Sequence, residues 1–219
     1  MDLAELFPIW DKLTPEQQQR LVRGASQRHV AAGTALGHGS ADCTGLLIVA
    51  SGQLRAYILS DEGRQITIYR LLERDVCLLS ASCAMRGMQF DVAIDAEKDS
   101  DLWVVAPSAY KILMEESAAV ANYTNEVMAG RFSDVMWLME QIMWRSFDKR
   151  LAAFLLDEAA LDETTRLKTT HEAIGNHLGT AREVVTRMLR YFQDEGMVKL
   201  SRGVIELTDP ARLRMLASS

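Results

Sequence analysis

Two short amphipathic segments joined by a glycine, between Thr169 and Thr208, constrain the fold of this 219-residue chain more than any other feature. Thr170 can cap a first helix, and Gly179 suits the left-handed turn that ends it. Thr180 can cap a second helix, with Glu183 three residues later completing a capping box. The buried side of the second helix is predicted to consist of Val184, Val185, Met188, Leu189 and Phe192. Two such helices form a helix-turn-helix.

A predicted hairpin follows the second helix. Asp194-Glu195-Gly196 ends the helix, and the stretch from Met197 to Leu200 is predicted to be a strand. Ser201-Arg202-Gly203 is a tight turn, after which Val204, Ile205 and Leu207 return. The segment therefore predicts a winged helix-turn-helix, with Arg202 at the tip of the wing, where a phosphate contact is possible.

The exposed side of the second helix carries side chains that can read base edges. In helix-turn-helix proteins the first residues of this helix enter the major groove. Arg187 can bind guanine O6 and N7, and Glu183 can accept a hydrogen bond from a cytosine amino group. Thr186 can offer a methyl group to thymine or a hydroxyl group to phosphate. The candidate DNA-binding set is Arg182, Glu183, Thr186, Arg187, Thr170, Thr180 and Arg202.

Two simpler considerations weigh against this interpretation. Glu183 and Arg187 are also spaced as a surface ion pair, worth only a few tenths of a kcal/mol. The net charge of −6 disfavours contact with phosphates. However, the stretch from Thr164 to Val204 holds seven basic and four acidic side chains, a local charge of +3.

The first half of the chain is patterned differently. Thr14-Pro15-Glu16-Gln17 predicts the start of a short helix. From His29 to Val105, short apolar runs alternate with glycines, and Asp61-Glu62-Gly63 is predicted to be a hairpin turn. Many short strands joined by turns predict a sandwich or barrel. The predicted strands include 46–49, ending at Ser51-Gly52, and then 54–59, 66–71, 90–96 and 102–105.

After Pro107 the pattern becomes helical, with a long helix predicted over 118–144. Its apolar residues recur at a mean spacing of 3.5, which is typical of a seam between partner helices and favours a homodimer. The alternative is a helix that lies on the core of its own domain. The seam consists of Met128, Phe132, Val135, Met139 and Ile142.

These features together resemble the Crp–Fnr superfamily of transcription regulators. The resemblance is most specific from Thr170 through Arg187, and again over 196–199 and 208–213. Glu183, Thr186 and Arg187 fall on the base-reading positions of the family. The resemblance implies an α+β fold with an effector-sensing double-stranded β-helix (β-roll or jelly roll) at 1–117, a dimerisation helix at 118–146 and a winged helix-turn-helix at 147–219. It implies binding to an inverted-repeat operator whose half-sites contain a TGA-like core.

The resemblance also bears on the effector. Cyclic-nucleotide binders of the family carry Gly-Glu and Arg-Ser pairs, where this chain has Cys77-Leu78 and Asp91-Val92. An aspartate facing a phosphate is repulsive, so we do not expect cyclic AMP to bind. The iron–sulfur branch uses a cysteine cluster near its N-terminus, but residues 1–42 contain no cysteine, and three thiols cannot supply four ligands. The cofactor is therefore unknown.

Three cysteines, Cys43, Cys77 and Cys83, leave several hypotheses open. Buried cysteines most often serve as small hydrophobic residues. A thiol redox switch is the functional alternative, and a Cys77–Cys83 bridge would need a turn between them. The spacing gives no support to a metal site that adds His38. A small apolar ligand or haem against Met85, Met88, Met128 and Met136 is a further hypothesis, although such methionines are more often core.

The remaining features concern compartment and class. The N-terminus is acidic where a secretory signal would be basic, and no apolar stretch is long enough to span a membrane. The odd cysteine count argues against a secreted disulfide framework, so we expect a cytoplasmic protein. A cupin-like metal enzyme would need a close His-x-His pair, whereas His29 and His38 stand nine residues apart. RNA polymerase is an expected partner if the regulator is an activator, and a sensor that acts only through protein contacts is the rival hypothesis.

Overall fold

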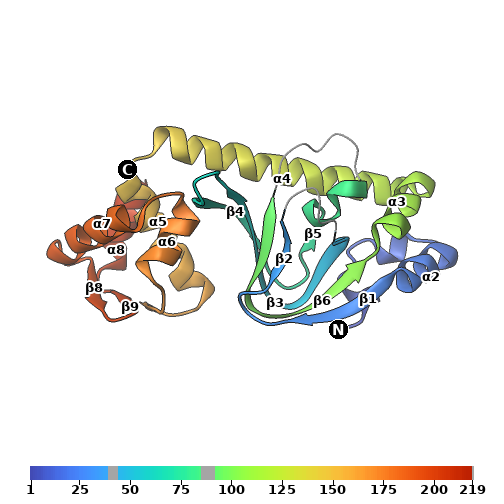
Figure 1. Ribbon diagram of the computed structural model, residues 1–219, viewed down its shortest axis with the longest axis horizontal. Helices are drawn as coiled ribbons and strands as arrows, with labels where there is room; N and C mark the ends of the chain where they lie inside the picture. The colour runs from blue at the N-terminus through green and yellow to red at the C-terminus, as the bar shows by residue number, and fades with distance from the viewer. Residues whose placement is uncertain (39–43, 85–91, 219) are drawn as a thin grey trace. The chain divides into compact units, whose positions relative to one another are not determined.

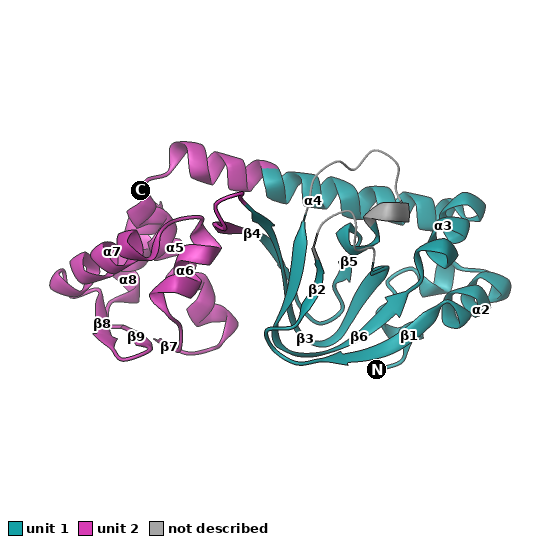
Figure 2. Ribbon diagram, viewed as in Figure 1, with its two compact units in different colours: residues 1–59, 68–135 teal, residues 60–67, 136–219 magenta. Residues whose placement is uncertain are grey.

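The computed structural model describes residues 1–38, 44–84 and 92–218 (Figure 1). These divide into two compact units (Figure 2). Unit 1 holds residues 1–59 and 68–135, and unit 2 holds residues 60–67 and 136–219. In the described part of the chain, no helix combines the length and apolar character needed to cross a membrane.

The helices begin and end close to the positions that the sequence indicates. The long helix α4 spans Ala118–Trp144, as predicted. At the start of α2, Thr14 and Gln17 form a capping box, in which each side chain accepts from the other residue's backbone N–H. The other helices are α1 (Leu3–Leu6), η1 (Trp10–Lys12), α2 (Pro15–Arg23), η2 (Leu79–Ala84), α3 (Pro107–Glu116), α5 (Phe147–Leu161), α6 (His171–Leu178), α7 (Arg182–Asp194) and α8 (Pro210–Ser218).

Unit 1 is built on a sheet in which β6 is the central partner. The strand order is β1-β6-β3-β4, with β2 paired to β6 and β5 to β3. The pairs that β6 makes with β1, β2 and β3 are antiparallel, which agrees with the predicted sandwich of an α+β fold. The strands are β1 (Ala25–Val30), β2 (Ala35–His38), β3 (Leu46–Leu59), β4 (Gln65–Leu71), β5 (Val76–Cys77) and β6 (Ala93–Val105).

The predicted strand breaks in this sheet were wrong in two places. The stretch Ser51-Gly52 does not end a strand but lies inside the 14-residue β3, where the pairing with β6 shifts register. Gly52 has φ +93°, and a Cβ there would approach the Asp99 carbonyl oxygen to 2.4 Å, so the glycine marks a β-bulge. Residues 93–105 likewise form one strand rather than two, while Phe90 and Asp91 lie outside the described residues.

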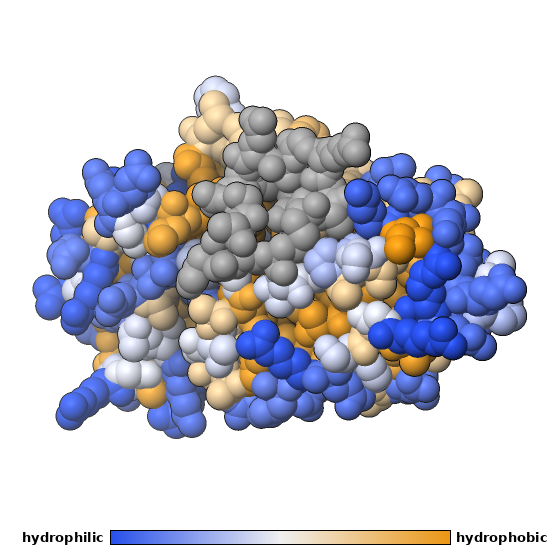
Figure 3. Space-filling model, turned by 45° about the vertical axis from the view of Figure 1, so that its right-hand side comes forward, coloured by the Kyte–Doolittle hydropathy of each residue, from blue (hydrophilic) through white to orange (hydrophobic). Residues whose placement is uncertain are grey.

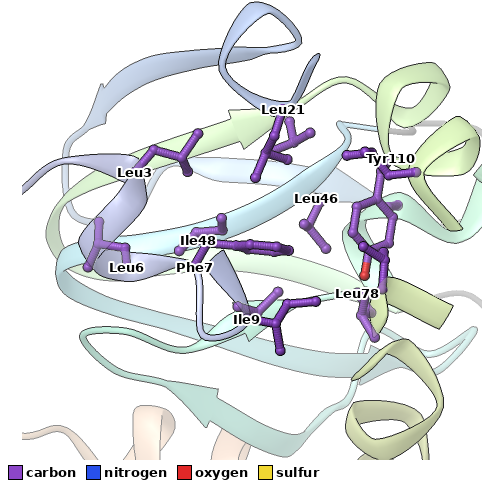
Figure 4. Close-up of a cluster of buried hydrophobic side chains, with 14 of the residues drawn as sticks. Leu3, Leu6, Phe7, Ile9, Leu21, Leu46, Ile48, Leu78 and Tyr110 are labelled. Atoms are coloured by element: carbon purple, nitrogen blue, oxygen red, sulfur yellow. The ribbon is translucent and has the colours of Figure 1, made fainter. Parts of the chain in front are cut away.

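Two apolar clusters cover the opposite faces of the sheet, because successive side chains of β3 point to opposite sides. Leu46 and Ile48 join the first cluster, which α1, α2 and α3 cover, whereas Leu47 and Val49 join the second. In the first cluster, Phe7 lies beside Ile48 (Figure 4). This alternation explains why the run 46–49 is apolar throughout: both of its faces are buried.

The second half of α4 leaves large apolar side chains at the surface. Tan and orange side chains reach the surface along the upper edge of Figure 3, the edge that α4 follows in Figure 1. Of the predicted seam, Met128 packs partly against the first core, but Phe132 is 67% exposed. The exposed apolar residues of α4 are Phe132, Met136, Trp137, Met139, Ile142, Met143 and Trp144.

Unit 2 has its own core, formed where α5, α6, α7 and α8 meet a small sheet of order β7-β9-β8. Leu151, Ile174, Leu189 and Phe192 are fully buried at its centre. The strands are β7 (Arg166–Leu167), β8 (Val198–Ser201) and β9 (Val204–Leu207), so the predicted wing hairpin is present.

Candidate nucleic-acid interface

The helix-turn-helix begins with α6. The Thr170 hydroxyl accepts a hydrogen bond from the Ala173 backbone N–H at 3.0 Å, which is the predicted cap. The helix ends at Gly179, which has φ +68° and ψ +38°, the left-handed conformation expected for a glycine. The backbone N–H groups of Gly179 and Thr180 both donate to the Gly175 carbonyl, which closes the turn tightly.

The Arg150 side chain of α5 anchors the end of α6. Its guanidinium group donates to the Leu178 carbonyl oxygen at 2.6 Å. Burial lowers the pKa of Arg150 below its ordinary value. A cation at the C-terminus of a helix is favourable because the terminal carbonyls are partly negative. This contact fixes the position of the turn from which the second helix starts.

The predicted capping role of Thr180 was wrong. Helix α7 begins at Arg182, and its N-cap is Ala181, which makes no side-chain cap. The physical reason is that the helix starts one residue later than predicted: Ala181 has the extended conformation of an N-cap (φ −74°, ψ 146°), and its carbonyl oxygen accepts from the Val184 and Val185 N–H groups. Glu183 is therefore the second residue of the helix and is not part of a capping box.

Helix α7 buries one side and exposes the other. Val185, Leu189 and Phe192 have no exposed surface. On the opposite side, Arg182, Glu183 and Arg187 are exposed, and Thr186 is half-buried. No ion pair joins Glu183 to Arg187 among the described residues, so the surface-pair alternative is not realised. The candidate base-reading side chains thus lie together on the first two turns of one helix.

A contact that the sequence analysis missed lies behind these side chains. The His171 Nδ1 atom, at the start of α6, is 2.8 Å from Thr186 Oγ1. The same hydroxyl donates to the Arg182 carbonyl oxygen at 2.9 Å. Burial lowers the pKa of His171, and the positive charges of Arg182 and Arg190 lower it further. No local pattern indicates a contact between residues fifteen positions apart, because only the turn brings the two helices together.

Arg202 lies at the tip of the wing, as predicted. Arg202 and Gly203 form the turn between β8 and β9, with Gly203 at φ +71°, and the Arg202 side chain is exposed. The hydrogen bond from the Leu200 N–H to the Gln193 side chain ties the wing to α7 at 2.9 Å. The wing and the exposed side of α7 therefore belong to the same compact unit.

Residues 60–67, the tip of the β3–β4 hairpin, also belong to unit 2 and contact the helix-turn-helix. Thr67 Oγ1 lies 2.8 Å from His177 Nδ1, and the backbones of Ile66 and Leu178 form an isolated antiparallel β-bridge. A Cβ at Gly179 would come within 3.0 Å of Ile66 Cδ1. The sequence predicts this hairpin turn, but no local pattern indicates its contact with α6.

The cysteines are placed differently from one another. Cys77 is fully buried in β5, with its Sγ atom 3.8 Å from the Tyr69 hydroxyl group. Burial raises the pKa of the Cys77 thiol, and this disfavours the reactive thiolate at neutral pH. A kinked turn, η2, follows Cys77 and contains Cys83, whose side chain lies outside the described residues. Cys43, Met85 and Met88 lie outside them as well.

The surroundings of Tyr69 include a charge that the sequence analysis did not single out. The Arg131 guanidinium group of α4 lies 4.1 Å above the centre of the Tyr69 ring, and it pairs with Asp134 at 3.0 Å. Tyr69 is itself buried in the second apolar cluster, and burial raises its pKa well above the ordinary value. Among the described residues no cluster of three or more His, Cys, Asp or Glu side chains is arranged to hold a metal ion.

Comparison with known proteins supports these features. Residues 149–216 match the Crp-like helix-turn-helix domain family. Electron transport regulator A of Shewanella oneidensis is 26% identical over 185 residues, covering 80% of this chain and 71% of that one. The cyclic AMP receptor protein of Thermus thermophilus is 23% identical over 210 residues, covering 96% of each.

A solved structure extends the similarity to the whole chain. The crystal structure of a transcriptional regulator described as of the crp/fnr family, from Eubacterium rectale, shares 60% identity with a TM-score of 0.96. The alignment covers 98% of this chain and all of that one. At this identity both the fold and the family are shared. The chain therefore belongs to the Crp/Fnr family of DNA-binding transcription regulators.

Proposed function

We propose that this regulator binds an inverted-repeat operator as a homodimer, reading a TGA-like half-site with α7. The supporting observation is the exposed side of α7, where Arg182, Glu183 and Arg187 point away from the core without ion-pair partners among the described residues. A side chain with no partner in the protein gives up no internal contact when it binds a base edge. Arg187 is assigned to a guanine and Glu183 to a cytosine amino group.

Phosphate contacts accompany this base readout. Thr170 and Thr180 lie at the start of α6 and in the turn before α7, where backbone N–H groups and helix N-termini favour anions. Arg202 extends from the wing and adds a flexible cation. These three residues are assigned to orient the protein on the duplex rather than to read its sequence.

The homodimer is supported by the exposed side chains of α4. Phe132 is 67% exposed, Met139 47% and Ile142 44%, all at the seam spacing. A run of large apolar side chains on one helix is costly in water, and a second copy of the same helix would cover it. A two-fold dimer carries two α7 helices, which matches the symmetry of an inverted repeat.

The sensor is assigned to residues 1–117, the dimerisation helix to 118–146 and the DNA-binding domain to 147–219. The signal is proposed to be other than cyclic AMP, since Cys77 and Leu78 are both buried and uncharged where cyclic-nucleotide binders have a Gly-Glu pair. A thiol redox signal and a small apolar ligand are the two candidates. The burial of Cys77 favours the apolar ligand, and redox chemistry would then depend on Cys43 and Cys83.

The setting follows from DNA binding. We place the protein in the cytoplasm of a bacterial cell, where the DNA is, and assign it no catalytic reaction. RNA polymerase is the further partner if the regulator activates transcription.

Fluorescence anisotropy of a labelled duplex with a TGA-type inverted repeat tests the proposal, at fixed salt and under reducing and mildly oxidising conditions. Arg187→Ala is expected to weaken binding by about 1–3 kcal/mol, roughly 5- to 150-fold, and to relax specificity at one base pair. Arg214→Ala is the matched control, because Arg214 is an exposed arginine of unit 2 that belongs to α8 and to neither α7 nor the wing. Equal affinities of wild type and Arg187→Ala would refute base reading by α7.

A further inference from the structure

The hydroxyl group of Thr186 is held by two partners inside the protein. Its Oγ1 atom donates to the Arg182 carbonyl oxygen at 2.9 Å, one turn earlier in α7. The His171 Nδ1 atom lies 2.8 Å from the same oxygen. Both contacts are within the ordinary range for strong hydrogen bonds.

The single proton of the hydroxyl group decides the direction of the second bond. Because Thr186 gives this proton to the Arg182 carbonyl oxygen, its Oγ1 atom can only accept from His171. His171 must therefore carry a proton on Nδ1. Both the neutral Nδ1–H tautomer and the imidazolium ion meet this condition, so the contact does not require a particular pH.

The two bonds fix the rotamer of Thr186. A β-branched side chain has one oxygen branch and one methyl branch, so fixing the oxygen also fixes the methyl group. The oxygen is turned toward the helix backbone and α6, while the side chain as a whole is only half-buried. The part of Thr186 that reaches the surface is therefore its methyl group. Around the helix, Thr186 lies between Arg182 and Glu183, at the edge of the exposed side of α7.

We propose that His171 is a positioning residue for DNA recognition, which holds the Thr186 methyl group toward the major groove. Thr186 then selects thymine, the pyrimidine that carries a 5-methyl group. This inference rests on the proposed function, in which α7 enters the major groove. The thymine methyl group is the only apolar feature of the base edges in that groove, and it is the natural partner of a side-chain methyl group. The hydroxyl contact to phosphate is then not available to Thr186.

A purely structural role for His171, joining α6 to α7, makes a different prediction. Such a role would affect folding and all DNA sequences alike. A positioning role affects discrimination at one base. Replacing thymine by deoxyuridine removes only the methyl group and keeps every hydrogen-bonding group, so it separates the two roles.

The experiment begins with duplexes enriched by the full-length protein from a randomised pool. Each thymine of the enriched half-site is then replaced in turn by deoxyuridine, and affinities are measured by anisotropy. Wild-type protein is expected to show one position where deoxyuridine weakens binding about fourfold, the value for removing one buried methyl group.

Four variants assign that penalty to particular atoms. Thr186→Ser keeps the hydroxyl group but lacks the methyl group, so it should lose the penalty, whereas Thr186→Val should keep it. His171→Ala should reduce the penalty. His171→Asn should restore it, because the asparagine amide nitrogen can stand where Nδ1 stands. Thermal melting of each variant verifies that it is folded.

The outcomes separate this inference from the proposed function. If no sequence is enriched, DNA reading fails and the inference with it. If a sequence is enriched but no thymine is sensitive to deoxyuridine, or Thr186→Ser keeps the penalty, methyl recognition by Thr186 is overturned alone. If His171→Ala keeps the full penalty while folded, His171 is structural. Loss in His171→Ala with recovery in His171→Asn supports the proposal.

Discussion

Replacing Gly175 by alanine tests how closely the turn between α6 and α7 is packed. Gly175 is a helical residue, so replacing it by alanine would ordinarily gain up to about 1 kcal/mol of helix propensity. In this fold, however, a Cβ at position 175 would lie 2.7 Å from the Thr180 carbonyl oxygen. That oxygen belongs to the backbone of the turn and cannot rotate away, so the turn itself must shift.

The size of the effect follows from these opposing terms. Forcing one extra carbon into a well-packed site costs about 1–3 kcal/mol, and the middle of this range exceeds the gain in propensity. From the middle of that range, about 2 kcal/mol, less a gain of about 1 kcal/mol, we expect Gly175→Ala to destabilise unit 2 by about 1 kcal/mol. In a unit of this size each kcal/mol lowers Tm by about 4–8 °C. The displaced Thr180 lies just before α7, so DNA affinity should fall as well.

Gly130 provides the matched comparison. It is also a helical glycine, in α4, but a Cβ there meets nothing within 4 Å. Gly130→Ala should therefore stabilise the protein by about 0.5–1 kcal/mol. Differential scanning calorimetry measures both variants against wild type. Melting of Gly175→Ala at or above the wild-type temperature would show that the close approach to Thr180 does not constrain the turn.

Two further predictions follow from α4 and from the buried thiol. Phe132→Glu places a charge on the exposed seam and should shift the protein from dimer to monomer in sedimentation velocity. Asn122→Glu, at an exposed polar position of the same helix, is the control. An unchanged dimer in Phe132→Glu would exclude this seam as the dimer interface. In a Cys43→Ser/Cys83→Ser background, Cys77 should react with a thiol reagent at pH 7 only after unfolding, because the thiol is buried and burial raises its pKa. The contribution of this neutral thiol to the free energy of unfolding should be present below its ordinary pKa and be lost as the pH rises toward its pKa in the folded protein. Rapid labelling of the native protein would contradict the burial of Cys77.

The sequence by itself determined the features that depend on neighbouring residues. The bounds of α4, the caps at Thr14 and Thr170 and the left-handed turn at Gly179 are all local. Each reflects a preference of one residue type for a backbone conformation, or a side chain that bonds to a backbone group within the same turn. The helix-turn-helix and its wing could be predicted for the same reason.

Only the tertiary structure decided the features in which distant segments meet. From its residue type alone, Gly52 is predicted to end a strand. In the structure, pairing with β6 continues on both sides of Gly52, and the glycine forms a β-bulge within β3. Thr180 is a good helix cap by type, but the turn places Ala181 at the N-cap, so α7 begins one residue later than predicted. The bond between His171 and Thr186 and the stacking of Arg131 on Tyr69 likewise join separate elements. Local preferences are weak next to backbone hydrogen bonds and close packing, so where they conflict the long-range contact prevails.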